Sequence, residues 1–173
     1  MKRHSVHMAI WKGHKDFAQK LLEDGADKDL VDQEKRSPLV HAIDMGFKKL
    51  AIYLIEAEAD LDVKDKDGRT ALMAAQRKNM PQLTKMLISS GADTESAMNQ
   101  GTTPLHYAAK TGDYGTVKQL LETETDLNRV TKVNCSTPLH LAIRRGHPGI
   151  AKLLLEKGAQ MDVLDKARCL PPV

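Results

Sequence analysis

The chain repeats one phrase of about 33 residues, and this period constrains its fold more than any single residue does. Openings of the form Ser/Thr-Pro/Ala-Leu recur at spacings of 33, 33 and 34 residues, beginning at Ser37, Thr70, Thr103 and Thr137. A closing marker that resembles Gly-Ala-Asp keeps the same spacing, and its five copies begin at Gly25, Glu58, Gly91, Glu124 and Gly158. Two unrelated markers on one period predict a solenoid, in which stacked units share a continuous core.

Each unit reads as a helix, a tight turn, a second helix and a polar hairpin. In the fourth unit, Thr103 before Pro104 is a strong helix start, because it pairs an N-cap hydroxyl with a proline at the first helical position. Gly112 ends this helix, since a residue there must enter the left-handed region. Leu120 lies on the apolar face of the second helix, and the polar stretch 122–136 predicts a hairpin that projects from the helices.

Three substitutions fall at positions where the other units carry glycine. Asn79 occupies the turn between helices, and asparagine is the best non-glycine residue for a left-handed position. Glu58 and Glu124 replace the glycine of the closing marker, which is expected to cost about 1 kcal/mol each if these residues are left-handed. We therefore expect the second and fourth units to be locally less stable.

The chain resembles the ankyrin-repeat family. The residues that carry the resemblance are the segments 103–109, Thr-Pro-Leu-His-Tyr-Ala-Ala, and 137–142, Thr-Pro-Leu-His-Leu-Ala. The resemblance implies an all-α solenoid of helix pairs joined by β-hairpin-like loops, with a concave binding surface. We expect a single domain over residues 1–173, with repeats at 1–31, 32–64, 65–97, 98–131 and 132–164. Residues 165–173 are then either the start of a sixth unit or a tail, and the first repeat is a degraded N-terminal cap.

The composition and the two cysteines indicate in which cellular compartment the protein is expected. No apolar stretch has secretory or membrane-spanning length, and a net charge of +3 is too small to indicate nucleic acid as a partner. Cys135 and Cys169 lie about one repeat apart, too far for a disulfide between stacked helices, so both are expected to be reduced thiols. We therefore expect a monomeric protein of the cytoplasm or nucleus, with no membrane partner.

The sequence offers little support for an enzyme. The resemblance assigns His7, His106 and His140 to the motif histidine, which is bonded within the hairpin scaffold, and His14 and His147 to a Gly-His pair after the turn. His4 and His41 remain, without a spacing that suggests a metal site. The acidic closes recur once per unit and are expected to bind turn amides rather than an ion. No catalytic residue, cofactor or metal is predicted, and the expected role is non-enzymatic.

Residues that differ between repeats are the candidates for binding another protein. In the ankyrin family the surface is formed by hairpin tips and by the ends of the first helices. Most of these positions here are basic, which favours an acidic segment of a partner, although helix C-termini also attract cations without any partner. Exposed apolar groups at such a rim, here a tryptophan and a methionine, are typical of contact hot spots. The candidate residues are Trp11, Lys12, Arg36, Asp44, Met45, Lys66, Arg69, Arg77, Lys78, Lys110, Arg144 and Arg145.

Two other functions stay open at this stage. The repeats could recruit substrate for a larger enzyme or regulatory complex whose catalytic part lies beyond Val173. Asn128, in a hairpin, also resembles the asparagine that hydroxylases modify in ankyrin repeats. The identity of the partner is not contained in the sequence.

Overall fold

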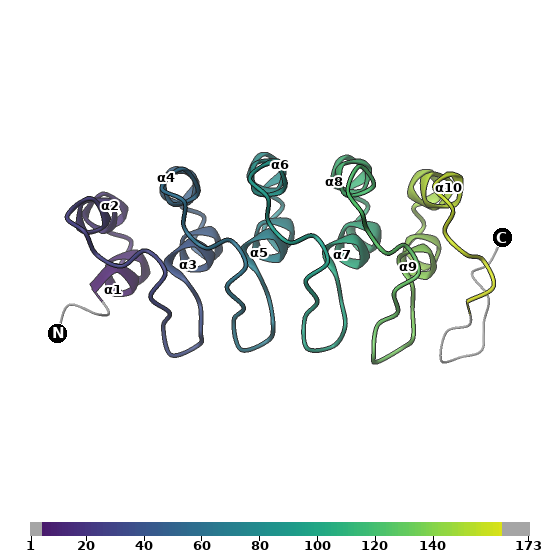
Figure 1. Cartoon of the computed structure of the whole chain (residues 1–173), viewed down its shortest axis with the longest axis horizontal. Coiled ribbons are helices and arrows are strands. Elements are labelled where there is room, and N and C mark those ends of the chain that lie inside the picture. The colour runs from purple at the N-terminus through teal and green to yellow at the C-terminus, as the bar shows by residue number, and fades with distance from the viewer. Residues whose placement is uncertain (1–4, 164–173) are drawn as a thin grey trace. The chain divides into compact units, whose positions relative to one another are not determined.

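The computed structural model describes residues 5–163 of the chain, and in this part it contains ten helices and no strand (Figure 1). The all-α repeat fold predicted from the sequence is confirmed. None of the helices in this part is long and apolar enough to cross a bilayer. His4, Cys169 and the predicted start of a sixth unit at 165–173 lie outside the described residues.

The helices fall into two compact units that divide between Asp93 and Thr94. The helices of the first unit are α1 (Ser5–Trp11), α2 (Lys15–Glu23), α3 (Pro38–Asp44), α4 (Lys48–Glu56), α5 (Ala71–Arg77) and α6 (Pro81–Ser89). Those of the second are α7 (Pro104–Thr111), α8 (Tyr114–Leu120), α9 (Pro138–Arg144) and α10 (Pro148–Glu156).

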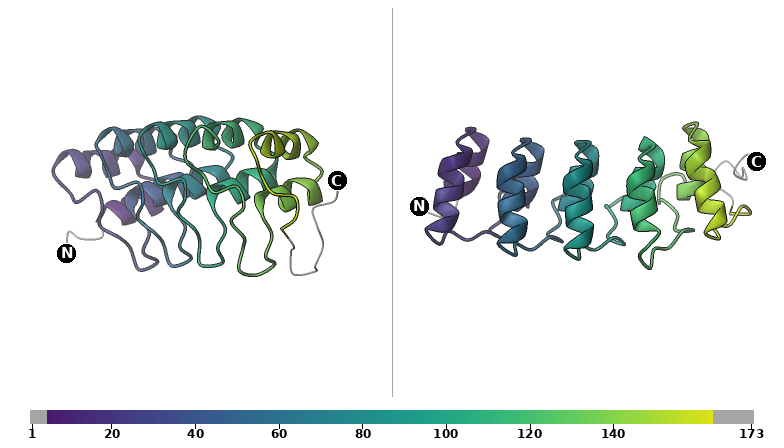
Figure 2. Two further views of the ribbon diagram at one scale, coloured as in Figure 1. Left: turned by 45° about the vertical axis from the view of Figure 1, so that its right-hand side comes forward. Right: turned by 90° about the horizontal axis from the view of Figure 1, so that it is seen from above.

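Helices pack in two rows within each unit. In the first unit α1, α3 and α5 contact one another in order, as do α2, α4 and α6, and the loops between repeats project from the row that contains α1 (Figures 1 and 2). In the second unit α7 packs on α9 and α8 on α10. Most of the largest fully buried side chains are aliphatic, among them Ile10, Leu39, Ile43, Leu54, Leu72, Leu105, Leu120, Leu139 and Leu154.

The predicted helix starts and turns are present. The hydroxyls of Thr103 and Thr137 accept the backbone N–H of His106 and His140, and a proline follows each threonine at the first helical position. Gly112 ends α7 with a φ of 80°, and Asn79 adopts a φ of 52° where other repeats carry glycine. Both left-handed turn predictions are therefore confirmed.

The two glutamates of the closing marker differ. Glu58 has a φ of 56° and is left-handed as predicted, whereas Glu124 does not adopt a positive φ, so the prediction for Glu124 was wrong. The reason lies in its neighbours, because the hydroxyls of Thr123 and Thr125 both donate to the carbonyl oxygen of Leu120, at 2.7 and 2.9 Å. These bonds satisfy the end of α8 without a left-handed residue.

Replacing Glu58 by glycine is expected to stabilise the chain by about 0.5–1 kcal/mol, because glycine adopts the left-handed region without steric cost. Chemical denaturation followed by circular dichroism measures this change. Glu124→Gly is the matched control, and it is expected to be neutral or destabilising, since its backbone gains nothing from glycine. Equal stabilisation by both substitutions would contradict the difference between the two sites.

Side-chain oxygens join consecutive loops in register. Asp27, Asp60 and Asp126 each accept the amide two residues further on, which confirms the predicted turn role of the acidic closes. A second oxygen in each loop accepts the backbone N–H of the next repeat. The acceptor and donor pairs are Asp29 with Asp60, Asp62 with Asp93, Glu95 with Asp126, and Asn128 with Gln160.

Candidate functional site

The structure brings three of the predicted binding residues together in one ion-pair network. Arg69 donates to Asp44, with an Nη2 to Oδ2 distance of 2.8 Å, and to Asp65 at 2.9 Å. Arg77 donates to the other oxygen of Asp44 at 2.8 Å. Arg69 and Asp44 are largely buried in this network, so their first role is to join the second and third repeats. Arg77 remains half-exposed and accessible to a partner.

Hairpin cations of the first unit are also paired. Arg36 donates to Asp32 at 2.8 Å, and Lys66 lies 3.1 Å from Glu34 of the preceding hairpin. The amide of Lys66 also donates to the carbonyl oxygen of Glu34, so these two hairpins are joined through backbone and side chain. The positive charge predicted for these hairpins is therefore offset by neighbouring carboxylates.

Large apolar side chains are exposed at the ends of the first helices. Trp11 at the end of α1 is 59 % exposed, Met8 on the same helix is 53 % exposed, and Met45 after α3 is 41 % exposed. The ammonium group of Lys12 lies 4.7 Å from the centre of a Trp11 ring. The predicted exposure of Trp11 and Met45 is thus present, and Met8 joins them as a residue that the sequence analysis did not single out.

A groove of about 390 Å³ opens between α1 and the first hairpin; we call it the α1 groove. It is lined by His7, Met8, Trp11, Asp32, Gln33, Glu34, Arg36 and His41. Only Trp11 and Arg36 of these eight were predicted. The period itself was the missed signal, because His7 and His41 are 34 residues apart, about one repeat, and so belong to adjacent first helices.

The two histidines at the base of the α1 groove face each other. Their ring planes differ by 22°, their centres are 5.4 Å apart, and their Nδ1 atoms point at each other at 3.1 Å. Burial lowers the pKa of His41 to about 4, and the nearby cation of Arg36 and the ring of His7 act in the same direction. Burial alone raises the pKa of Asp32, but hydrogen bonds from Arg36 outweigh it and hold that pKa below its ordinary value. His7, His41 and Asp32 offer donor atoms that all lie within 4.8 Å of one another.

In the second unit the motif histidines are held by the scaffold. The Nε2 atom of His106 donates to the carbonyl oxygen of Ser136 at 3.1 Å, and its Nδ1 accepts from Thr103, the N-cap of α7. His140 makes the same contact with Thr137. Burial lowers the pKa of His106 to about 4, so this ring is neutral at pH 7. The structural role predicted for these two histidines is present.

The remaining predicted residues are exposed. Lys78 follows α5 in the first unit, and Lys110, Arg144 and Arg145 lie near the ends of α7 and α9 in the second. Asn128, the proposed modification site, accepts the amide of Gln160 at 2.8 Å. These four basic residues are exposed, as are Lys12 and, in part, Arg77.

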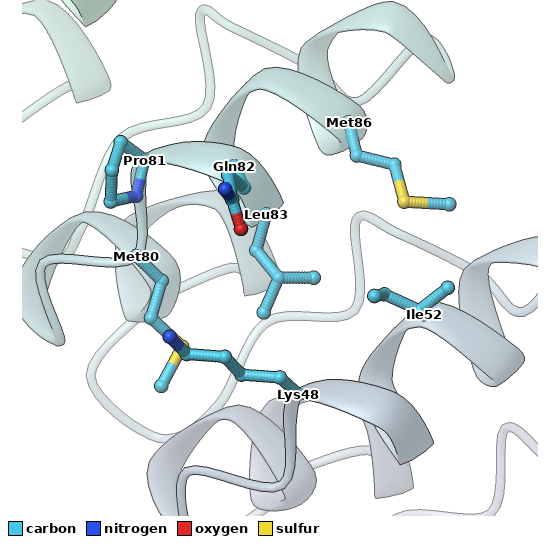
Figure 3. Close-up of a pocket in the computed structure, with 7 residues that line it drawn as sticks. All are labelled: Lys48, Ile52, Met80, Pro81, Gln82, Leu83 and Met86. Carbon is cyan, nitrogen blue, oxygen red and sulfur yellow. The ribbon is translucent and has the colours of Figure 1, made fainter.

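The described part of the chain has other hollows, and two of them are mainly apolar. A notch of about 140 Å³ lies between α4 and α6, where Leu83 and Met86 face Ile52 (Figure 3). An apolar hollow of about 500 Å³ is lined by residues of α9 and α10, including Leu139 and Leu155. The notch is smaller than the α1 groove, and the face of α9 and α10 corresponds to the faces by which neighbouring repeats pack in each unit. Neither hollow is lined by the variable residues at the ends of the first helices.

Comparison with protein families gives one match that spans almost the whole chain. A family model of ankyrin repeats, which contains three copies, matches residues 6–97 and again residues 74–165. No curated protein matches the chain.

Proposed function

Because the chain belongs to the ankyrin-repeat family, whose repeats generally bind other proteins, we propose that it is a non-enzymatic adaptor that contacts a partner protein through the ends of its first helices. The observation that carries this proposal is the exposure of three large apolar side chains on or just after the first helices, Met8, Trp11 and Met45. The positions that the repeats share are buried by contrast, as Leu39, Leu72 and Leu105 are. The fold therefore uses the shared positions and leaves the variable ones for recognition.

The α1 groove is the centre of the proposed contact. Trp11 and Met8 provide large apolar surfaces, and tryptophan is enriched among the residues that dominate binding energy. Charged and polar side chains of the hairpin form the opposite wall, so an apolar side chain of the partner can enter with polar groups around it. The groove is largely preformed by helix packing, which limits the entropy lost on binding.

Exposed cations are a second feature of the proposal, taken in each unit by itself. Lys78 is exposed in the first unit, and Lys110, Arg144 and Arg145 are exposed in the second, where acidic segments of a partner fit them. Such rim contacts speed association and set orientation more than they raise affinity. They are weaker in salt, because charges in solution are screened over about 10 Å at 0.1 M ionic strength.

Capture from cell lysate with the immobilised chain, quantified by mass spectrometry, tests the proposal. Trp11→Ala is expected to reduce recovery of specific partners by about tenfold or more, because loss of a central aromatic contact costs about 2 kcal/mol or more. Phe17→Ala is the matched control, since Phe17 on α2 is 56 % exposed but does not line the α1 groove. The Phe17→Ala chain should recover partners as efficiently as the unaltered chain does.

The same assay separates the parts of the proposal. Partners that depend on Trp11 and are also released as salt rises use both the groove and the cations. Partners that depend on Trp11 at all salt concentrations use the groove without an acidic segment. Equal recovery by the Trp11 and Phe17 variants excludes the α1 groove as the binding site.

A further inference from the structure

The first repeat holds its motif histidine differently from the repeats of the second unit. His106 and His140 direct Nδ1 to the threonine at the N-cap of their own helix. The corresponding position of the first repeat is occupied by His4 instead of threonine. The Nδ1 atom of His7 lies 3.1 Å from Nδ1 of His41 in the next repeat. In the first repeat two imidazole nitrogens therefore lie against each other, and both histidines line the α1 groove.

We propose that His7, His41 and Asp32 bind a divalent transition-metal ion of the zinc class. Zn–N bonds of about 2.0–2.1 Å place two ligand nitrogens about 3.3 Å apart in a tetrahedral site, close to the 3.1 Å found here. The two Nδ1 atoms point at each other, so both rings must turn to direct their lone pairs at one ion. Two imidazoles and a carboxylate are a common set of protein ligands for zinc. All three donor atoms already lie within 4.8 Å of one another, so the carboxylate needs to approach by up to about 1.5 Å to complete this set.

The hydrogen bond on the far side of His7 favours the required tautomer. Nε2 of His7 lies 2.6 Å from the carbonyl oxygen of Leu30, and a carbonyl can only accept, so Nε2 carries the proton. Nδ1 is then the nitrogen with the lone pair that a metal requires. Metal-binding histidines usually hold the second ring nitrogen in this way, through a backbone carbonyl or a carboxylate. His41 can supply its own Nδ1 lone pair by moving its proton to Nε2, with no change in charge.

Asp32 is held in place as a third ligand. Its Oδ1 accepts the backbone N–H groups of Glu34 and Arg36, and its Oδ2 accepts from the guanidinium group of Arg36 at 2.8 Å. Arg36 Nε also donates to Oδ2 at 2.9 Å, so four donors fix the carboxylate, and Arg36 must give up one of its contacts to Oδ2 for the metal to bind there. Arg36 also opposes a cation at this site by charge, so the two imidazoles are expected to contribute most of the affinity. All three residues line the α1 groove, so water or a partner side chain in the groove would supply the fourth ligand.

Titration of the full chain with ZnCl₂, followed by calorimetry, tests this site. One saturable ion per chain is expected, and bound zinc should raise the melting temperature, because it binds the folded state. His7→Gln and His41→Gln should each weaken zinc binding by at least about tenfold, since loss of even an outer partner of a ligand has that effect. Asp32→Asn should weaken it less. His14→Gln is the matched control, because His14 is an exposed histidine of the same repeat and does not line the α1 groove.

Two measurements keep the test informative if a histidine variant unfolds. Circular dichroism of each variant without metal shows whether it is folded. In the unaltered chain, the imidazole nitrogen resonances of His7 and His41 should shift on zinc addition, and Co²⁺ should give the absorption of a tetrahedral ion. Absence of saturable binding, shifts confined to other histidines, or unchanged affinity in both folded histidine variants overturns the proposal. The experiment needs no partner protein, so its outcome is independent of the proposed binding function.

Discussion

The free energy of unfolding is expected to fall by about 3 kcal/mol through His106 alone as the pH drops from 6.5 to about 4. His106 is completely buried, and burial is the main cause of its lowered pKa. The unfolded chain takes up this proton near pH 6.5, whereas the folded chain resists it until about pH 4. The unfolded state therefore binds more protons throughout this window, and stability decreases as the pH falls.

Denaturant unfolding at a series of pH values, with a chelator present, measures this loss. His106→Gln is the control, because glutamine has no charge to gain, and its stability should depend less steeply on pH. His41, whose pKa is also lowered to about 4, contributes to the acid sensitivity of both proteins. The difference between the two pH profiles therefore isolates His106. Identical profiles would show that this histidine does not take up its proton on unfolding.

Leu54→Ala is expected to destabilise the protein by about 2–5 kcal/mol, because it removes a buried side chain and leaves a cavity. Leu54 is completely buried in α4, between the two helix rows of the first unit. Close packing in this layer leaves the surrounding side chains little room to collapse into the space. The loss should appear as a lower midpoint of denaturant unfolding measured by circular dichroism.

Ile52→Ala provides the comparison on the same helix. Ile52 is 36 % exposed and borders the notch of Figure 3, so its removal opens space that solvent already reaches. Its expected cost is about 1 kcal/mol or less. A similar cost for both substitutions would contradict the assignment of α4 as a helix with one buried face.

The 33-residue period predicted the helix starts and turns closely, because these depend on interactions within one repeat. The left-handed turn at Asn79 follows from its place in the phrase, as does the cap at Thr103. Glu124 shows the limit of this reasoning. Two threonine hydroxyls beside it satisfy the end of α8, and a comparison based on the glycine position alone does not consider them.

The candidate site was less predictable because it depends on contacts between repeats. Asp44 and Arg77 were both placed at the ends of first helices, but their pairing through Arg69 depends on how those helices stack. Likewise, His41 has no second histidine or cysteine close to it in sequence and meets His7 only one repeat away. Side-chain directions across that distance are set by packing, which the spacing of motifs does not specify.

The oxygens that join consecutive loops have a consequence for the chemical ageing of the protein. Asn128 accepts the amide of Gln160 where Asp29 and Asp62 perform the same task in the first unit. Deamidation of Asn128 to aspartate leaves an oxygen in the same position, so the altered loop retains this bond. The isoaspartate that accompanies deamidation instead lengthens the backbone by one carbon and moves that oxygen out of register. One product of the same spontaneous reaction is therefore compatible with the repeat, while the other disrupts the link between the last two loops.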